Sequence, residues 1–530
     1  MSIRHPRSAA ILAALAFALP AAAGAQTVWT GATGSWFDAG NWSDGVPDAS
    51  AEARIDNTGT GTIESTGAAA YRVTLGFDVA DTGTLDVDSN ATLDVTSDLS
   101  VGYGGNGALA IGGGAIVNDY SGEIGYTTQS QSGIQGDAVV DGAGSAWNHV
   151  FELYVGYGTG TLTVSNGASV HNVYGYLGYF PESPGHSSGT ATIDGAGSIW
   201  TNDANLHIGD GGTGVVTVSN GGALVNGEGD LGYGFGSDGT ATITGAGSSW
   251  TTNGFIYVGN DGDGTLNVMD GGMASSLGSF GYLAWDANST GAANIDGAGS
   301  SWTNANGLYV GFGGTGTLTI TDGGSMQNGT FANVGFSEGA VGVLSVSGPG
   351  STFGTGGALS IGGNVSGPGG RGYLGVDDGG TVSAAAVNVW NTGQVALSSA
   401  GRIEAATVTI DAPLLVDDFG GASIAGDLVL TPAATTTIGI YGGIGGLTIS
   451  GTATLAGSLT IHVDGQDTPG QYALIEADGG LGGSTFASVS VTPPAGMTAD
   501  VTYDDTHAYL VLASAQDPDV VFRDGFDGTP

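Results

Sequence analysis

The sequence of 530 residues has no cysteine, no lysine and only 14 prolines. Without disulfides the fold must be stabilised by a long continuous core. Because proline is scarce and no Gly-X-Y period exists, the 104 glycines do not indicate a collagen-like chain. Seven basic residues against 49 acidic ones give a net charge of −42. Such a surface repels nucleic acid and anionic membranes, so neither is an expected partner.

Long hydrophobic runs are also missing, apart from Ala9 to Leu19 near the N-terminus. This run is well short of the ~20 residues that span a bilayer. Arg4 and Arg7 precede it, and the small residues Ala23 to Ala25 follow it. This order is typical of a secretory signal peptide cleaved near Ala25/Gln26. We therefore expect the chain to be secreted or to reach the bacterial outer cell surface.

What the sequence does contain is repetition. The segment from Asp141 to Trp147, DGAGSAW, returns at intervals of 50 to 53 residues. The aromatic residues at the end of each copy are Trp147, Trp200, Trp250, Trp302 and, in a degenerate copy, Phe353. A finer period of 22 to 31 residues places an aliphatic residue before glycine, as in Val155-Gly156. Short alternating segments such as Thr161 to Val164 follow most of these pairs and have the pattern of strands with one buried face.

A unit of about 25 residues cannot bury its apolar face alone, whereas stacked units share one core. The pattern therefore predicts an all-β parallel β-solenoid, with two turns in each 52-residue repeat. Solenoid ends expose strand edges and need caps, and three tryptophans within residues 26–70 predict one at the N-terminus. The expected organisation is a signal peptide at 1–25, an N-terminal cap at 26–70, regular turns at 71–365, irregular turns at 366–445, a β-rich C-terminal cap at 446–514 and a flexible acidic tail at 515–530.

The unit DGAGSxWTN…LYVGxGGTGTLTVSNGG resembles the repeat of autotransporter (type V secretion) passengers and of PEP-CTERM-associated surface proteins. The opening WTGATGSWFDAGNWSDGVP and the segment LTISGTATLAGSLTIHV also resemble such proteins. The resemblance implies a right-handed parallel β-helix, display or release outside the cell, and commonly an adhesive or structural role.

The sequence departs from autotransporters at its C-terminus. A membrane β-barrel needs many strands of about 9 to 11 residues, and only 18 residues follow Leu512. We therefore expect separate outer-membrane export machinery. Within the tail, VFRDGF resembles a short sorting or processing motif of exported Gram-negative proteins.

Enzymes with parallel β-helices use clustered aspartates, and some add calcium and a basic residue. Asp377-Asp378 with Arg371, and Asp417-Asp418 with Arg402, could form such clusters. The alternative interpretation is that these aspartates lie in ordinary acidic turns and that the neighbouring arginine has no catalytic role. The repeated serines Ser145, Ser198, Ser248 and Ser300 are not accompanied by a recurring histidine, so we interpret them as structural.

Metal ligands are sparse. The histidines His149, His171, His186 and His207 stand singly along the chain, which does not predict a zinc site. Asp261 and Asp263 share one glycine-rich turn and are the calcium candidates, although they provide too few ligands alone. No other cofactor is expected.

Aromatic residues follow the repeated glycines, and we expect them to stack in the core or at the turns. They are Phe77, Tyr103, Tyr126, Tyr157, Tyr179, Tyr233, Phe312 and Phe336. If this strip is exposed, Tyr157, Tyr179 and Tyr233 are candidate glycan contacts.

The sequence thus predicts an elongated, monomeric structural or adhesive protein without a catalytic site. Its expected partner is an extracellular glycan or a host or neighbouring cell surface. The alternative is a polysaccharide lyase or hydrolase built on the same scaffold.

Overall fold

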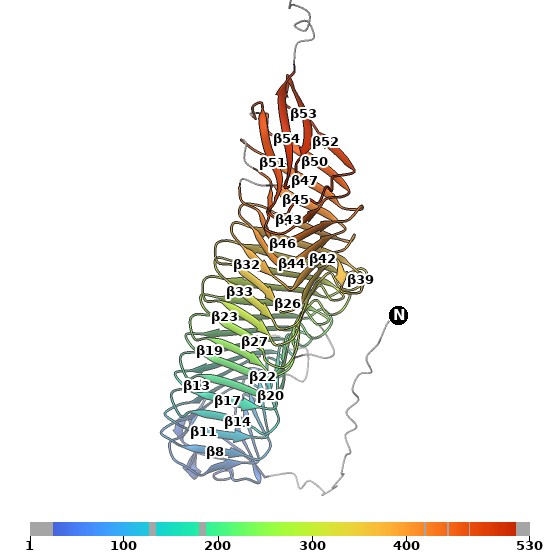
Figure 1. Ribbon diagram of the computed structural model, residues 1–530. Helices are drawn as coiled ribbons and strands as arrows, with labels where there is room; N and C mark the ends of the chain where they lie inside the picture. Colours follow the sequence, from blue (N-terminus) through green and yellow to red (C-terminus); the bar gives the residue numbers. More distant parts are fainter. Residues whose placement is uncertain are drawn as a thin grey trace, which may run out of the picture.

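The computed structural model describes residues 25–126, 134–179, 187–417, 420–442, 445–465 and 467–515. Strands account for 59% of the chain and helix for 1%, and the strands form a parallel β-solenoid of about 17 turns. This confirms the predicted fold class, and Figure 1 shows the resulting elongated shaft. Most of the predicted signal peptide, the tail with VFRDGF, His186 and Asp418 lie outside the described residues.

Apart from the first and last turns, each turn of the shaft contributes strands to three faces, which the chain visits in the same order. The strands of the first face are β2 (Thr33–Ser35), β4 (Thr60–Ile63), β7 (Thr82–Val87), β10 (Asn106–Ile111), β13 (Gln135–Asp141), β16 (Thr159–Ser165), β19 (Ser188–Asp194), β21 (Thr213–Ser219), β23 (Asp238–Thr244), β26 (Asp263–Met269), β29 (Thr290–Asp296), β32 (Thr315–Thr321), β35 (Val341–Ser347), β40 (Arg371–Asp377), β43 (Gly393–Leu397), β45 (Pro413–Asp417), β47 (Thr435–Ile440), β50 (Ser458–Val463) and β52 (Ser488–Val491).

The second and third faces are joined where one long strand serves both. The strands of the second face are β5 (Ala68–Ala70), β8 (Thr92–Val95), β11 (Ile116–Asp119), β14 (Ala146–His149), β17 (Ser169–Asn172), β24 (Ser249–Thr252), β27 (Met273–Ser276), β30 (Ser301–Asn304), β33 (Ser325–Asn328), β36 (Thr352–Thr355), β41 (Thr381–Ser383), β48 (Leu447–Ile449) and β51 (Gly470–Ala477). The strands of the third face are β1 (Ala25–Val28), β3 (Ala51–Ile55), β6 (Arg72–Leu75), β9 (Asp98–Val101), β12 (Ser121–Ile124), β15 (Glu152–Val155), β18 (Tyr174–Leu177), β25 (Ile256–Val258), β28 (Gly281–Leu283), β31 (Leu308–Val310), β34 (Ala332–Val334), β37 (Ala358–Ile361), β42 (Ala386–Val389) and β49 (Ala453–Thr454). The shared strands are β20 (Ile199–Ile208), β22 (Ala223–Leu231), β44 (Arg402–Ile410) and β46 (Ser423–Leu430).

Alternation of apolar and polar residues fixes the register of every face. In β16, Leu162 and Val164 are buried, while the intervening threonines point outward. Leu162 is the register partner of Ala138 on one side and Ala191 on the other, so equivalent core residues stack along the shaft. A shift by one residue would turn the whole apolar set to solvent, which is why this register is strongly specified.

The recurrent aromatic residues occupy equivalent core positions on the second face. Trp147, Trp200, Trp250 and Trp302 are fully buried, and Phe353 is almost so. Three of the indoles donate a hydrogen bond to a polar side chain at the end of the preceding second-face strand. These bonds are Trp147 to Asp119 (2.6 Å), Trp200 to Asn172 (2.7 Å) and Trp250 to Asn226 (2.6 Å). In these three repeats a polar residue at the inner corner therefore accepts from the indole of the next turn, whereas the indole nitrogen of Trp302 is buried without such a partner.

The serines of the DGAGS turns are buried hydrogen-bond acceptors. Ser198 Oγ accepts from the backbone N–H of Gly167 at 3.0 Å and donates to the carbonyl of Asp194 at 2.6 Å. Ser145, Ser248 and Ser300 accept from Gly114, Gly221 and Gly271 in the same way. These hydroxyls therefore link successive turns of the shaft.

The ends of the shaft differ from its middle. At the N-terminal end Trp29, Trp36 and Trp42 are buried, and Trp42 contacts both others edge-on with ring centroids 5.0 and 4.9 Å apart. A short 3-10 helix, η1 (Ala39–Asn41), lies between Trp36 and Trp42. At the other end β53 (Met497–Tyr503) and β54 (His507–Ser514) extend β51 as an antiparallel sheet, drawn in red in Figure 1. No helix among the described residues is long and apolar enough to cross a membrane.

Candidate functional site

The outer side of the third face carries a row of side chains in continuous register. We call it the strand row, and its members are Glu123, Tyr154, Tyr176, His207, Asp230, Tyr257, Tyr282 and Tyr309. Each member lies between two core residues of its strand, as Tyr154 lies between Leu153 and Val155, so it points away from the core. Sequence analysis missed these tyrosines, although most directly precede the repeated aliphatic-glycine pair.

A second row lies beside it, in the turns that leave the third face. This turn row consists of Phe77, Tyr103, Tyr126, Tyr157, Tyr179, Tyr233, Trp285, Phe312 and Phe336, each two residues after the end of its strand. The residue between strand and aromatic has positive φ, and it is glycine everywhere except before Trp285, where it is Ala284; φ is +79° at Gly156. A Cβ atom there would collide with the carbonyl of Ser188 on the next turn. Glycine thus lets the chain turn so sharply that the aromatic residue folds back over the strand row.

Rings of the turn row stack on one another from turn to turn. Ring centroids are 5.4 Å apart for Phe77 and Tyr103 and 5.2 Å apart for Tyr103 and Tyr126, with planes within 18° of parallel. The guanidinium of Arg54 lies 3.4 Å from the ring centroid of Phe77 and covers the first ring of the stack. The expected stacking at the turns therefore occurs, and most of its rings are partly exposed, with Tyr233 at 41%.

In the C-terminal half the two rows form perpendicular stacks. Tyr257, Tyr282 and Tyr309 are parallel with centroids 5.0 Å apart, and Trp285 and Phe312 are parallel at 4.4 Å. Tyr309 meets Phe312 edge-on at 89°. Parallel rings at 5.0 Å are slipped rather than directly superimposed. Tyr257 and Tyr309 are partly exposed, whereas Tyr282 between them is buried.

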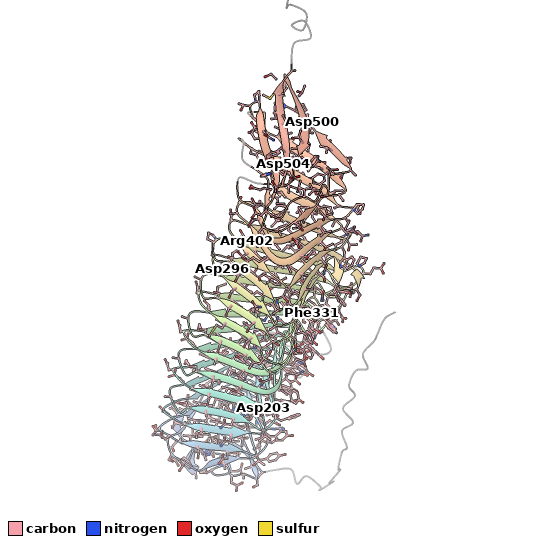
Figure 2. The ribbon with its side chains drawn as sticks, in the orientation of Figure 1. Asp203, Asp296, Phe331, Arg402, Asp500 and Asp504 are labelled. Atoms are coloured by element: carbon pink, nitrogen blue, oxygen red, sulfur yellow. The ribbon has the colours of Figure 1, made fainter. Side chains whose placement is uncertain are left out.

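A further group of aromatic residues adjoins these stacks. Phe331, labelled in Figure 2, lies with its ring centroid 5.3 Å from that of Tyr309 and 5.8 Å from that of Phe280. Phe280 lies in turn 6.2 Å from Phe255. The third face thus carries apolar rings over most of its length.

A group of polar residues interrupts the two rows between Tyr176 and Tyr257. We call it the polar break, and it comprises His207, Asp210, Glu228, Asp230 and Asn260. His207 Nδ1 lies 3.1 Å from Asp210 Oδ2, and its Nε2 lies 3.5 Å from Asp230 Oδ2. Asn260 donates to Asp230 Oδ1 at 2.8 Å, and the imidazole stacks on Tyr233 with centroids 3.9 Å apart. Two carboxylates therefore lie at the two nitrogens of one imidazole.

Burial shifts the pKa values of the titratable residues in the polar break. It raises the pKa of Asp230 to about 6, although the nearby His207 opposes the shift. It also raises the pKa of Glu228. Burial lowers the pKa of His207, but the hydrogen bond with Asp210 and the charges of its acidic neighbours outweigh it, so the net shift is upward.

The acidic and basic residues considered from sequence do not converge. Arg371 and Asp377 lie at opposite ends of β40, about 20 Å apart for an extended strand of this length. Arg402, labelled in Figure 2, forms a 2.7 Å ion pair with Glu404 on its own strand. Arg371 therefore lies apart from Asp377, and among the described residues Arg402 forms no ion pair with Asp417.

The calcium candidates lie in a turn that leads into β26. Asp261 is half-buried and Asp263 is exposed, and Asp263 Oδ1 accepts from the hydroxyl of Thr290 at 2.5 Å. No group of three or more metal-ligating side chains is found in the part of the chain that the structure describes.

One further histidine forms a buried pair that sequence reasoning did not find. His149 Nδ1 lies 2.5 Å from Asp119 Oδ1, and both side chains are inaccessible to solvent. The other oxygen of Asp119 accepts from Trp147. This pair occupies the inner corner where later turns have asparagine, so it belongs to the core.

The chain matches no protein-family model, and no curated protein matches it by sequence.

Proposed function

We propose that this protein is a secreted or surface-displayed shaft that binds an extracellular polysaccharide along its third face. The observation that supports this is the turn row, whose rings are partly exposed from turn to turn and pack over the strand row. The apolar C–H faces of pyranose rings pack against aromatic side chains, which offer a large and rigid contact area. The role is structural and adhesive, and the partner is a glycan in the surroundings or on a neighbouring cell.

The spacing of the rows supports an extended ligand. Successive turns of the shaft are about 4.8 Å apart, which is comparable with the length that one sugar unit adds to a polysaccharide. A glycan lying parallel to the shaft would therefore meet an aromatic ring at nearly every unit. Weak contacts that repeat along one ligand together give a higher overall affinity than any single contact does.

The test is binding of the purified chain to a glycan array and to insoluble polysaccharides. A variant with Tyr157, Tyr179 and Tyr233 replaced by alanine should bind at least about tenfold more weakly, since three ring contacts contribute roughly 0.5 to 1.5 kcal/mol each. The matched control replaces Tyr71 and Tyr120, which are 43% and 47% exposed but belong to neither row. Equal binding by both variants, or no binding to any glycan, would refute the proposal.

The polar break favours a second candidate, a polysaccharide lyase or hydrolase. A buried carboxyl with a pKa near 6, beside a second carboxyl and a histidine, has properties that suit a general acid. The same polysaccharides should then yield new reducing or unsaturated ends with the native chain and none with Asp230→Asn. Binding without such products would leave the adhesive function.

A further inference from the structure

A cavity on the first face lies far along the shaft from the polar break. Its volume is about 440 Å³. Its wall consists of the first residues of β35 (Val341–Val343) and β40 (Arg371–Tyr373), of residues 391–394 at the start of β43, and of Pro413. Its volume lies in the range of small-molecule sites, which is about 300 to 1,000 Å³. In a chain with 49 acidic residues, this cavity is lined by none.

Its charged residue is an arginine without a partner. Arg54, Arg72 and Arg402 pair with Asp56, Asp98 and Glu404. Among the described residues, Arg371 alone of the arginines has no ion pair, and its side chain is exposed at the cavity wall. A guanidinium offers a planar fork of donors that matches a carboxylate.

The rest of the wall offers groups that suit sugar hydroxyls. The side-chain amides of Asn391 and Gln394 make no hydrogen bond within the described chain, and an amide can both donate and accept. Tyr373 lies on the same strand as Arg371, with its ring over Gly375. One cation, two amides without hydrogen bonds and a ring are side chains that can bind an acidic sugar.

The wall is held in place by a hairpin inserted between two turns. Strands β38 (Gly363–Asn364) and β39 (Gly367–Pro368) pair antiparallel and project from the shaft, as Figure 1 shows at the label β39. Trp390 Nε1 donates to the carbonyl of Asn364 at 2.8 Å, and Thr392 Oγ1 donates to the carbonyl of Gly362 at 2.6 Å. The residues on both sides of Asn391 are therefore anchored, one to the hairpin and one to Gly362 just before it, which reduces the ordering needed on binding.

We propose that this cavity binds a uronate, a sugar unit that bears a carboxylate. Arg371 pairs with the carboxylate, and Asn391 and Gln394 bind the hydroxyls. The site is independent of the aromatic rows, because it lies on another face and recognises charge rather than apolar surface.

The experiment uses isothermal titration of the full chain with trimers of galacturonate, glucuronate, mannuronate and guluronate, and with a neutral galactose trimer. At least one uronate trimer should bind, with an affinity that falls as salt is raised, and the neutral trimer should bind at least tenfold more weakly. Arg371→Gln should weaken uronate binding at least tenfold. Arg402→Gln makes the same change of net charge outside the cavity and should leave the affinity unchanged.

Failure of all four uronates to bind, equal loss in both arginine variants, or equal binding of the neutral trimer would each overturn the proposal. Thermal unfolding of both variants checks that the exposed substitutions leave the fold intact. The variant lacking Tyr157, Tyr179 and Tyr233 should keep its uronate affinity. The two proposals can therefore fail separately.

Discussion

Glu123 provides a direct test of how deeply the strand row is buried beneath the turn row. Its carboxylate accepts a hydrogen bond from Ser100 at 2.7 Å, yet burial raises its pKa from 4.5 to about 7. A carboxyl of this kind keeps its proton in the folded chain after the unfolded chain has released it. Stability therefore falls as the pH rises from about 4.5 to about 7, and stays lower above that.

The substitution Glu123→Gln removes the charge and keeps an oxygen that can accept from Ser100. Each pKa unit corresponds to about 1.4 kcal/mol, so between pH 5 and pH 8.5 the stability gained by the variant over the native chain should grow by about 2 to 3 kcal/mol. The free energy of unfolding in urea, measured at both pH values, gives this difference directly. The larger gain must appear at the higher pH.

The exposed Glu338 provides the matched control, since Glu338→Gln makes the same change of net charge. Its effect on stability should stay within about 0.5 kcal/mol at both pH values. A gain for Glu123→Gln that does not depend on pH would contradict the burial argument. An equal gain in the Glu338 variant would instead assign the effect to the acidic surface as a whole.

Two further predictions concern the repeat itself. Gly156→Ala should lower the free energy of unfolding by at least about 1 to 3 kcal/mol, because alanine is strained at positive φ and its Cβ would also collide with the carbonyl of Ser188. Ala284→Gly, at a turn where alanine already has φ +56°, should raise it by up to about 1 kcal/mol. Urea unfolding of the two variants measures both effects. Trp250→Phe should destabilise the shaft by about 1 kcal/mol more than Trp302→Phe, because only Trp250 loses an indole hydrogen bond. Equal effects of the two tryptophan variants in the same assay would show that the bond to Asn226 contributes little.

The solenoid was predictable because its determinants are local and repeated. Alternation in segments such as Thr161 to Val164 identifies a strand, and Asn166-Gly167 marks the turn that ends it, where both residues have positive φ. The recurrence of Trp147 at intervals of 50 to 53 residues then fixes how successive repeats superimpose. None of these inferences required knowledge of contacts between distant segments.

The candidate site was harder to predict because it depends on which side a residue faces. The aromatic residues after the glycines were recognisable, but whether Tyr157 lies in the core or outside depends on the geometry of the turn at Gly156. Residues close in sequence also proved misleading. Arg371 and Asp377 are six positions apart, and an extended strand separates them widely. His207 and Asp230 are farther apart in sequence and lie side by side because they are register partners on adjacent turns.

Residues that repeat along the shaft and residues that interrupt the repeat therefore point to different kinds of ligand or role. Stacking equivalent turns to build a core also stacks whatever side chains point outward, so a periodic outer row arises wherever the core is periodic. Such a row favours a ligand that is itself periodic. The positions that break the period are different, since the core does not require them. His207 and Asp230 replace tyrosines in the strand row, and the hairpin before Arg371 interrupts the spacing of the turns. At these positions, a role in binding or catalysis explains the choice of residue more simply than core stacking does.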